Sequence, residues 1–186
     1  MSNTGIIYGV NGPVIYLKGD SGFKISEMVY VGPEHLVGEI IGLKKGMTTV
    51  QVFEETTGLK PGDTVTGTGD AISVLLGPGI IHNIFDGIQR PLEEIAKASG
   101  KYISRGVSVD SLDTEKKWNT HITVKEGDVV GPGSIIAETR ETDSILHKSM
   151  VPPNLTEATV IHAASDGAYT ILEPIVTIQF ADGTTN

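Results

Sequence analysis

The residue types that most often bind metals are few in this chain and lie far apart. The sequence has no cysteine and five histidines, which are His35, His82, His121, His147 and His162. Zinc sites usually take two ligands a few positions apart, and no two of these histidines have that spacing. The spacing favours structural or solvent-exposed roles for all five. The lack of cysteine excludes thiolate metal sites, disulfides and a cysteine nucleophile.

A phosphate-binding loop is not indicated either. The P-loop pattern needs glycine, four residues and then Gly-Lys-Ser/Thr, so that backbone amides and the lysine surround the phosphates. The Gly100-Lys101 pair lies near a helix signal, but Tyr102 follows it and Ile95 stands where the first glycine belongs. We therefore do not expect this chain to bind ATP by itself.

Signals for covalent catalysis are also missing. There is no Gly-x-Ser-x-Gly nucleophile elbow. The paired acids Glu54-Glu55 and Glu93-Glu94 are typical of solvated turns or helix starts, although a fold can still bring distant carboxylates together. Lys148 is the nearest candidate for a lipoyl-type modified lysine. It lies in a strand-like run rather than at a hairpin tip, which favours a structural role.

Composition narrows the class of protein further. The chain has 14 Lys and Arg against 23 Asp and Glu, a formal net charge of −9, which disfavours a broad nucleic-acid surface. No apolar run approaches the roughly 20 residues needed to span a bilayer. The N-terminal residues lack the basic region and long apolar core of a secretory signal. These features predict a cytoplasmic globular protein.

The elements that must position the side chains are mostly short strands. The 23 glycines and 9 prolines are spread along the chain between β-rich runs. The predicted strands of the first part are 5–10, 13–18, 28–31, 37–43 and 47–53, with turns at Asn11-Gly12, at 19–22 and at 59–63. Five or six strands at this spacing indicate a small closed barrel over residues 1–69.

One helix and a second β unit follow the predicted barrel. Pro91 suits a first helical position and Gly100 a helix end, which predicts a helix over 91–99. The later predicted strands are 120–124, 134–139, 145–150, 156–163, 168–172 and 175–180. Residues 124–137 are similar to the strand–turn–strand of lipoyl- and biotinyl-type barrel sandwiches. The fold class predicted is mainly β: an N-terminal barrel, a short helix and a barrel-sandwich-like unit.

A long segment with few charges lies between the two β parts. Residues 77–92 (GPGIIHNIFDGIQRPL) show no clear period, which indicates a packing or interface role. The candidate interface residues are Ile80, Ile81, Ile84 and Phe85. If the partner surface is absent, these side chains are expected to be exposed or disordered.

Several runs of this sequence resemble the catalytic A subunit of vacuolar- and archaeal-type rotary ATPases. The matching runs are residues 9–14 (GVNGPV), 28–41, 77–92, 103–118 and 147–153 (HKSMVPP). The resemblance covers essentially all 186 residues, and the Gln-Arg-Pro-Leu and His-Lys-x-Met-Val-Pro-Pro runs are the specific ones.

The resemblance implies three regions and a role in assembly. It implies a barrel over 1–69, the opening of the nucleotide-binding domain over 70–110, and the non-homologous or bulge domain over 111–186. The parent subunit would couple ATP hydrolysis or synthesis to proton or sodium transport, with ATP and Mg²⁺ bound there. The family's P-loop does not occur before Asn186, so we expect a fragment without catalytic, cofactor or metal residues. Expected partners are the B subunit, other A subunits and the peripheral stalk, at the membrane periphery.

Two other functions stay open at this point. One is a stand-alone, non-catalytic binding module that regulates the ATPase. The other is an enzyme whose site is assembled across the two β units, which would need a deep pocket with perturbed acids.

Overall fold

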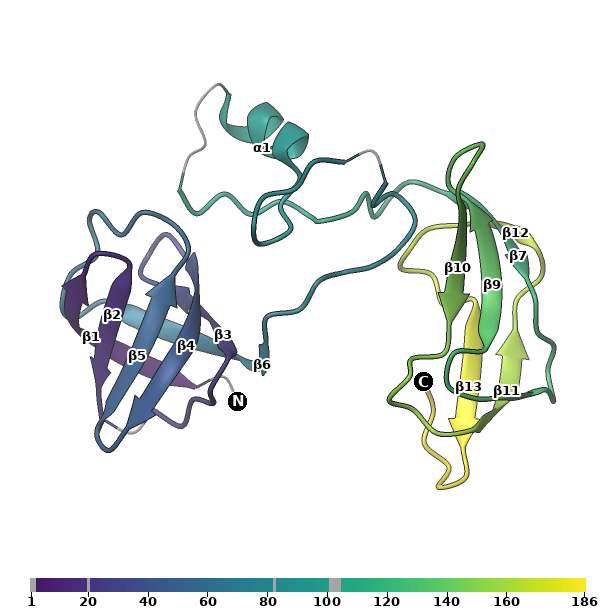
Figure 1. Cartoon of the computed structure of the whole chain (residues 1–186), viewed down its shortest axis with the longest axis horizontal. Coiled ribbons are helices and arrows are strands. Elements are labelled where there is room, and N and C mark those ends of the chain that lie inside the picture. Colours follow the sequence, from purple (N-terminus) through teal and green to yellow (C-terminus); the bar gives the residue numbers. More distant parts are fainter. Residues whose placement is uncertain (1–2, 20, 82, 101–104) are drawn as a thin grey trace. The chain divides into compact units, whose positions relative to one another are not determined.

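Short strands separated by turns make up most of the chain in the computed structural model, which describes residues 3–19, 21–81, 83–100 and 105–186. The chain divides into a barrel unit, Met1–Val74 with Glu94–Val109, and a C-terminal unit, Leu75–Glu93 with Asp110–Asn186 (Figure 1). The predicted mainly β fold with one helix is confirmed for these described ranges. No helix in them is long and apolar enough to cross a membrane.

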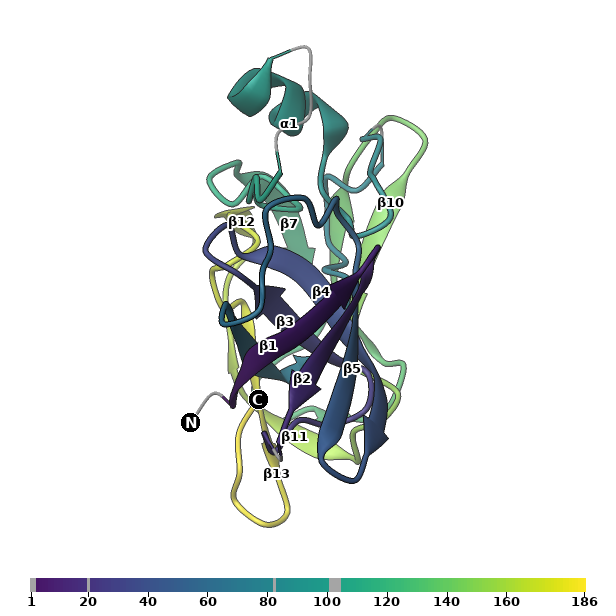
Figure 2. The same cartoon turned by 90° about the vertical axis from the view of Figure 1, so that its left-hand side faces the viewer.

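Six antiparallel strands form the barrel. They are β1 (Thr4–Asn11), β2 (Val14–Lys18), β3 (Glu27–Val31), β4 (Leu36–Lys44), β5 (Met47–Val52) and β6 (Thr64–Ala71). Hydrogen bonds join them in the order β1-β2-β5-β4-β3-β6, and β6 pairs with β1 to close the ring. Figure 2 shows β1, β2 and β5 side by side on the near wall. The N-terminal barrel predicted from the sequence is confirmed.

Alternation along each strand builds the core of the barrel. In β2, Ile15 and Leu17 are fully buried whereas Lys18 is exposed. The buried apolar side chains of the core are Ile7, Ile15, Leu17, Phe23, Val29, Val31, Leu36, Ile40, Val50, Val52 and Val65. Burying one large aliphatic side chain stabilises a fold by about 1.5–3 kcal/mol, so this cluster is the main source of barrel stability.

Strand β6 is an element that the sequence analysis did not name. Its inward positions include Val65 and Gly67, so the apolar alternation that marks the other strands is weak here. A Cβ on Gly67 would lie 2.2 Å from Oε1 of Glu27 and 2.9 Å from the Phe23 ring. The Glu27 carboxylate, 1% exposed, accepts hydrogen bonds from the amides of Lys24 and Gly69. A buried carboxylate therefore fills the space that an apolar side chain of β6 would otherwise occupy.

The first hairpin turn lies one residue later than predicted. Asn11 pairs with Val14, which leaves Gly12 and Pro13 as the two turn residues. Gly12 has a φ of 57° and Pro13 is not among the residues of positive φ. A glycine of positive φ at the first central position is typical of a type II′ turn, whose twist suits a hairpin.

The same turn sequence, Lys-x-Gly-Asp, occurs once in each unit. In residues 60–63 the Asp63 carboxylate accepts the amide of Lys60 (3.0 Å), and the Asp63 amide returns a bond to the Lys60 carbonyl (3.1 Å). In residues 125–128 the corresponding distances are 2.8 and 3.1 Å. Both glycines have positive φ, 100° and 91°, as the third position of a type II turn requires. The first turn was predicted over 59–63 and is confirmed, and the second lies within residues 124–137, where the sequence is similar to a strand–turn–strand.

Helix α1 (Leu92–Ser99) begins one residue after the predicted start. Pro91 lies just before it and forms an isolated bridge with Phe85, while the Leu92 amide donates to the Ile84 carbonyl. Gly100, with a φ of 76°, ends the helix. Its amide donates to a carbonyl of the last turn, which satisfies one of the carbonyls left open at a helix end.

Two small sheets form the C-terminal unit. The strands are β7 (Trp118–Ile122), β8 (Val129–Val130), β9 (Ile135–Arg140), β10 (Leu146–Met150), β11 (Ala158–Ala163), β12 (Gly167–Tyr169) and β13 (Val176–Phe180). Their orders are β10-β9-β7-β12 and β13-β11-β8. The buried apolar side chains of one core cluster are Val130, Val151, Ala158, Val160 and Ile178.

Apart from shifts of one or two residues at strand ends, two details of the C-terminal unit differ from the prediction. The two-residue strand β8 was not predicted, because two residues carry no readable period. The strand expected over 168–172 ends at Tyr169, since the Thr170 amide donates to the Glu173 carboxylate (2.6 Å) and starts a turn.

Candidate functional site

Four of the five histidines lie in the described part of the chain, and each has its own neighbours. His35 occupies a turn with a φ of 55°, and its ring lies 6.1 Å from that of Tyr30. The other described histidines each face one carboxylate: His121 with Asp166 at 2.6 Å, His147 with Glu141 at 3.9 Å and His162 with Glu126 at 3.4 Å. Within the described ranges, no three His, Asp or Glu side chains lie close enough together to hold a metal ion. His82 and the Lys101-Tyr102 pair lie outside the described residues.

The other chemical candidates are engaged in local structure. Lys148 lies inside β10, as predicted, with its Nζ 3.7 Å from Oε1 of Glu138 on the neighbouring strand. Glu94 pairs with Lys97 on α1. These contacts support the structural role that the sequence analysis favoured for them.

The lowered pKa values follow from hydrogen bonds to the carboxylates. In Asp113, Glu173 and Asp182 the chief donors lie two or three positions away in the sequence, whereas the pKa of Asp166 is lowered by the amide of Ile122 on β7 and then by His121. The Asp166 carboxylate raises the pKa of His121 by hydrogen bonding and by its charge. A general acid at neutral pH needs a carboxyl pKa shifted upward, and the shifts of these four acids run in the opposite direction.

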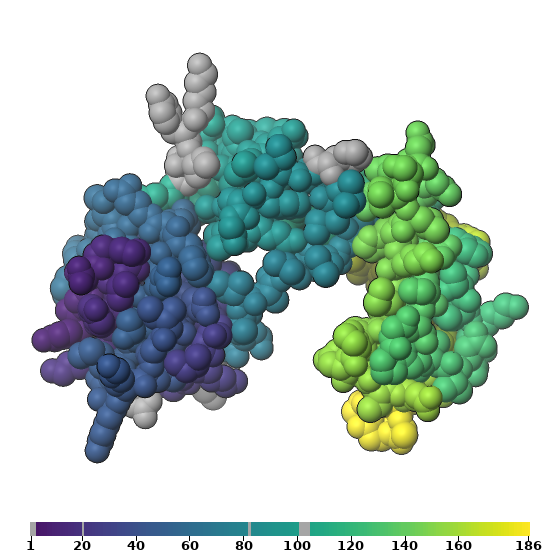
Figure 3. All heavy atoms as spheres, viewed as in Figure 1, coloured from purple at the N-terminus to yellow at the C-terminus, as the bar shows by residue number. Residues whose placement is uncertain are grey.

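The predicted interface residues lie in the segment 75–93 of the C-terminal unit, drawn in teal at the surface in Figure 3. The side chains of Ile84 and Ile81 are 69% and 42% exposed. Ile80 and Phe85 are half-buried. Large exposed aliphatic side chains are available for contact, which is what the interface hypothesis requires.

The carboxylate of Glu141, about 60 residues later in the sequence, holds the backbone of Gly79 and Ile81 in this segment. Oε1 of Glu141 accepts the amides of Gly79 and Ile81, each at 2.8 Å. Gly79 has a φ of 104°, and a Cβ there would lie 3.3 Å from Cζ2 of Trp118. Sequence reasoning missed Glu141, because nothing local marks a single acid in a turn as the partner of a distant glycine.

A second carboxylate organises the middle of the segment. Oδ1 of Asp86 accepts the amides of Ile88 (3.0 Å) and Arg90 (2.9 Å), and Oδ2 pairs with Nε of Arg90 at 2.8 Å. Burial acts to raise the pKa of Asp86. The hydrogen bonds from Arg90 and Ile88 and the charge of Arg90 outweigh burial, and they hold this pKa below its usual range. The Asp-x-x-x-Arg spacing in this run therefore serves local structure.

The side chain of Gln89 binds the backbone of Leu75, the first residue of segment 75–93. Its side-chain amide accepts the Leu75 amide (2.7 Å) and donates to the Leu75 carbonyl (2.6 Å), so that it imitates a strand pairing. Gln89 itself has a φ of 62°, which is unusual for a residue other than glycine. The two hydrogen bonds offset the strain of this conformation and explain why glutamine suits the position.

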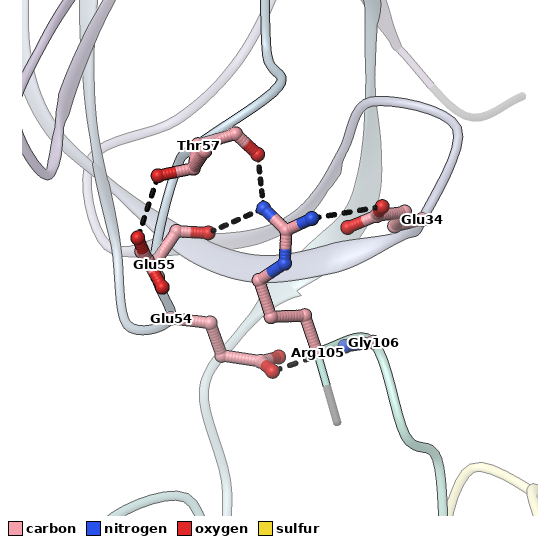
Figure 4. A network of polar contacts seen from close by, with 6 residues as sticks. All are labelled: Glu34, Glu54, Glu55, Thr57, Arg105 and Gly106. Atoms are coloured by element: carbon pink, nitrogen blue, oxygen red, sulfur yellow. Dashed lines mark hydrogen bonds and ion pairs between the residues drawn. The ribbon is translucent and has the colours of Figure 1, made fainter. Parts of the chain in front are cut away.

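A separate polar network belongs to the barrel unit (Figure 4). The Arg105 guanidinium donates to the carbonyl of Thr57 and lies 3.2 Å from the Glu34 carboxylate. The next amide, that of Gly106, donates to Oε2 of Glu54 at 3.0 Å. Gly106 has a φ of 65°, and a Cβ there would lie 2.2 Å from the Glu34 carbonyl oxygen. The Arg105-Gly106 pair thus ties the end of this unit to two barrel loops.

Two family models match the chain. Residues 7–69 match the model described as "ATP synthase alpha/beta family, beta-barrel domain", and residues 109–186 match "ATPsynthase alpha/beta subunit barrel-sandwich domain". The first match coincides with the barrel, and the second begins near the return of the chain to the C-terminal unit.

Curated relatives match nearly the whole chain. It is 48% identical over 179 residues to the V-type ATP synthase alpha chain of Halothermothrix orenii, with 96% of this chain and 30% of the relative covered. It is 46% identical over 185 residues to the A subunit of the A-type ATP synthase of Methanopyrus kandleri, with 98% and 31% covered. The corresponding A subunit of Pyrococcus abyssi is 46% identical, with 96% and 18% covered. The chain therefore spans about a third or less of the length of these relatives.

Proposed function

The chain belongs to the ATP synthase alpha/beta family, as the N-terminal region of a V/A-type A subunit, and from this we propose that it serves assembly rather than catalysis. The observation that carries the proposal is the 46–48% identity across both β units and the segment between them. The parent subunit would couple ATP hydrolysis or synthesis to proton or sodium transport, with ATP and Mg²⁺ bound outside this chain. The comparisons give no support to the alternative of a stand-alone regulatory module.

Each part of the chain has its own proposed contacts. The barrel would lie against neighbouring A and B subunits of the ring, and the C-terminal unit would face the peripheral stalk. Residues 70–110 would open the nucleotide-binding domain. The complex would sit in the cytoplasm at the membrane surface.

The predicted interface would pack against the rest of the nucleotide-binding domain. Ile81 and Ile84 are exposed in the chain described here, and contact with an apolar partner would remove them from water. Burial of one large aliphatic side chain is worth about 1.5–3 kcal/mol, so two such side chains can affect affinity strongly.

Co-purification tests the proposal. The chain is co-expressed with the remainder of the parent chain, the B subunit, and the stalk subunits, and the masses of the complexes are measured by native mass spectrometry. We expect a complex with the parent chain and loss of that complex with Ile84→Ser. Leu172→Ser is a matched control, since Leu172 has the same exposed fraction, 69%, in the same unit. If the chain binds none of these partners, the assembly role is refuted.

A further inference from the structure

We infer that Glu141 is a positioning residue that fixes how Ile80, Ile81, Ile84 and Phe85 are presented; its importance for assembly rests on the proposed function, whereas its structural role does not. Glu141 directly follows β9, and its side chain is 2% exposed. It is therefore not itself a surface for a partner. Its influence would pass through the backbone that it holds.

One oxygen of Glu141 accepts hydrogen bonds from two amides that lie two residues apart in the sequence. Gly79 and Ile81 both donate to Oε1 of Glu141, at 2.8 Å each. Amides two residues apart converge on one anion when the backbone between them turns with a left-handed residue, and Gly79 supplies that residue with its φ of 104°. The backbone that follows Gly77-Pro78 in the segment is thus shaped as a receptor for a carboxylate of the same unit.

Within the described part of the chain, the other oxygen of Glu141 makes no hydrogen bond that would draw the carboxylate away from these amides. Oε2 of Glu141 is buried and has no hydrogen-bond partner among the described residues, and Nδ1 of His147 lies 3.9 Å from it. A buried acceptor without a partner is costly, so the arrangement persists because Oε1 makes two charge-assisted bonds. The two hydrogen bonds of the Glu141 carboxylate therefore both go to the backbone of this segment.

The segment beyond Ile81 depends on this anchor for its course. Asn83 donates to the Gly79 carbonyl at 2.7 Å, so the residue next to Ile84 is held by the same glycine. Without the carboxylate, the amides of Gly79 and Ile81 would lose their acceptor. The apolar side chains would then be displayed by a looser loop on an intact β unit.

Amide exchange in the isolated 186-residue chain tests the anchor. In Glu141→Ala we expect the exchange of the Gly79 and Ile81 amides to accelerate by about tenfold or more, the factor for one hydrogen bond to a charged group. Glu141→Gln keeps an acceptor oxygen and should restore most of the protection. Glu138→Ala removes a nearby acid, half-buried and paired with Lys148, and should leave these two amides unchanged. Unchanged exchange in Glu141→Ala would overturn the inference.

A measurement on the unmutated protein covers the case in which Glu141→Ala does not fold. Scalar couplings across the hydrogen bonds should connect the nitrogens of Gly79 and Ile81 to Cδ of Glu141. Their presence supports the anchor, and their absence under conditions that show strand couplings would refute it.

Binding then separates the inference from the proposed function. If Ile84→Ser weakens the complex with the parent chain and Glu141→Ala weakens it too, the positioning role is supported. If Ile84→Ser acts and Glu141→Ala does not, the positioning role fails. If neither acts although amide exchange shows the anchor, the anchor stands and the interface proposed for Ile80, Ile81, Ile84 and Phe85 is what fails.

Discussion

Replacing Gly79 with alanine should destabilise the C-terminal unit by about 2–3 kcal/mol. Gly79 has a φ of 104°, where a side chain costs on the order of 1–2 kcal/mol. The added Cβ would also lie 3.3 Å from Cζ2 of Trp118, closer than an ordinary carbon contact. Any backbone shift that relieves this contact moves the amide that donates to Glu141, so the two effects should add.

The chain offers a built-in reporter and a matched control for this variant. Trp118 is the single tryptophan of the sequence and belongs to the same unit as Gly79, so its fluorescence in a urea titration reports that unit. With an m value of about 2 kcal/mol/M, we expect the midpoint to fall by about 1–1.5 M. Gly87→Ala lies in the same segment, at a φ that is not positive, with nothing within 4 Å of its Cβ. It should leave stability unchanged or raise it by less than about 1 kcal/mol. Equal midpoints for the two variants would refute the reasoning.

Three further predictions concern charged side chains. Asp86→Ala should free the two amides that its carboxylate binds and cost about 3 kcal/mol of local stability, seen as faster amide exchange. Because the pKa of Asp86 is lowered in the fold, this stabilisation is fully present above pH 3.8, the usual pKa of the carboxyl, and is lost as pH falls through the pKa of the folded protein. A stability difference between the wild type and Asp86→Ala that stays constant at low pH would contradict this prediction. The pKa of His121 is raised by Asp166, so the pair stabilises the fold below about pH 6.5 and loses that effect as pH rises through the folded value. In an NMR titration Asp166→Asn should lower the pKa of His121, and an unchanged value would argue against the contact. Arg105→Ala should weaken the attachment of its turn by about 1 kcal/mol, read as about fivefold faster exchange of the Gly106 amide, and unaltered exchange would count against the network.

Local pattern was sufficient for most of the fold. Buried and more exposed positions alternate along the barrel strands β2 and β5, and that period follows from the pleat of a strand whatever its partners are. Strand β6 shows where this reasoning stops. Its inward Gly67 makes sense only once the Glu27 carboxylate is known to occupy the adjacent space, and that contact joins residues 40 positions apart.

Residues 77–92 could be identified from the sequence as a candidate interface, but the residue that holds their backbone in place could not. The resemblance and the low charge of residues 77–92 led to Ile81 and Ile84, whose exposure fits the prediction without testing the interface itself. Glu141 has no neighbouring signal, because the amides it binds are identified only by the three-dimensional course of the chain. Pairings of this kind are decided by tertiary structure rather than by period or spacing.

The two Lys-x-Gly-Asp turns share one backbone conformation, but their second residues restrict the unfolded chain to different extents. The second position is Pro61 in the barrel unit and Glu126 in the C-terminal unit. Proline narrows the range of conformations open to the unfolded chain, whereas glutamate leaves that range wide. The later turn therefore loses more conformational entropy on folding than the earlier one. Proline at position 126 should thus stabilise the C-terminal unit through its unfolded state, at the cost only of the exposed pair that Glu126 makes with His162.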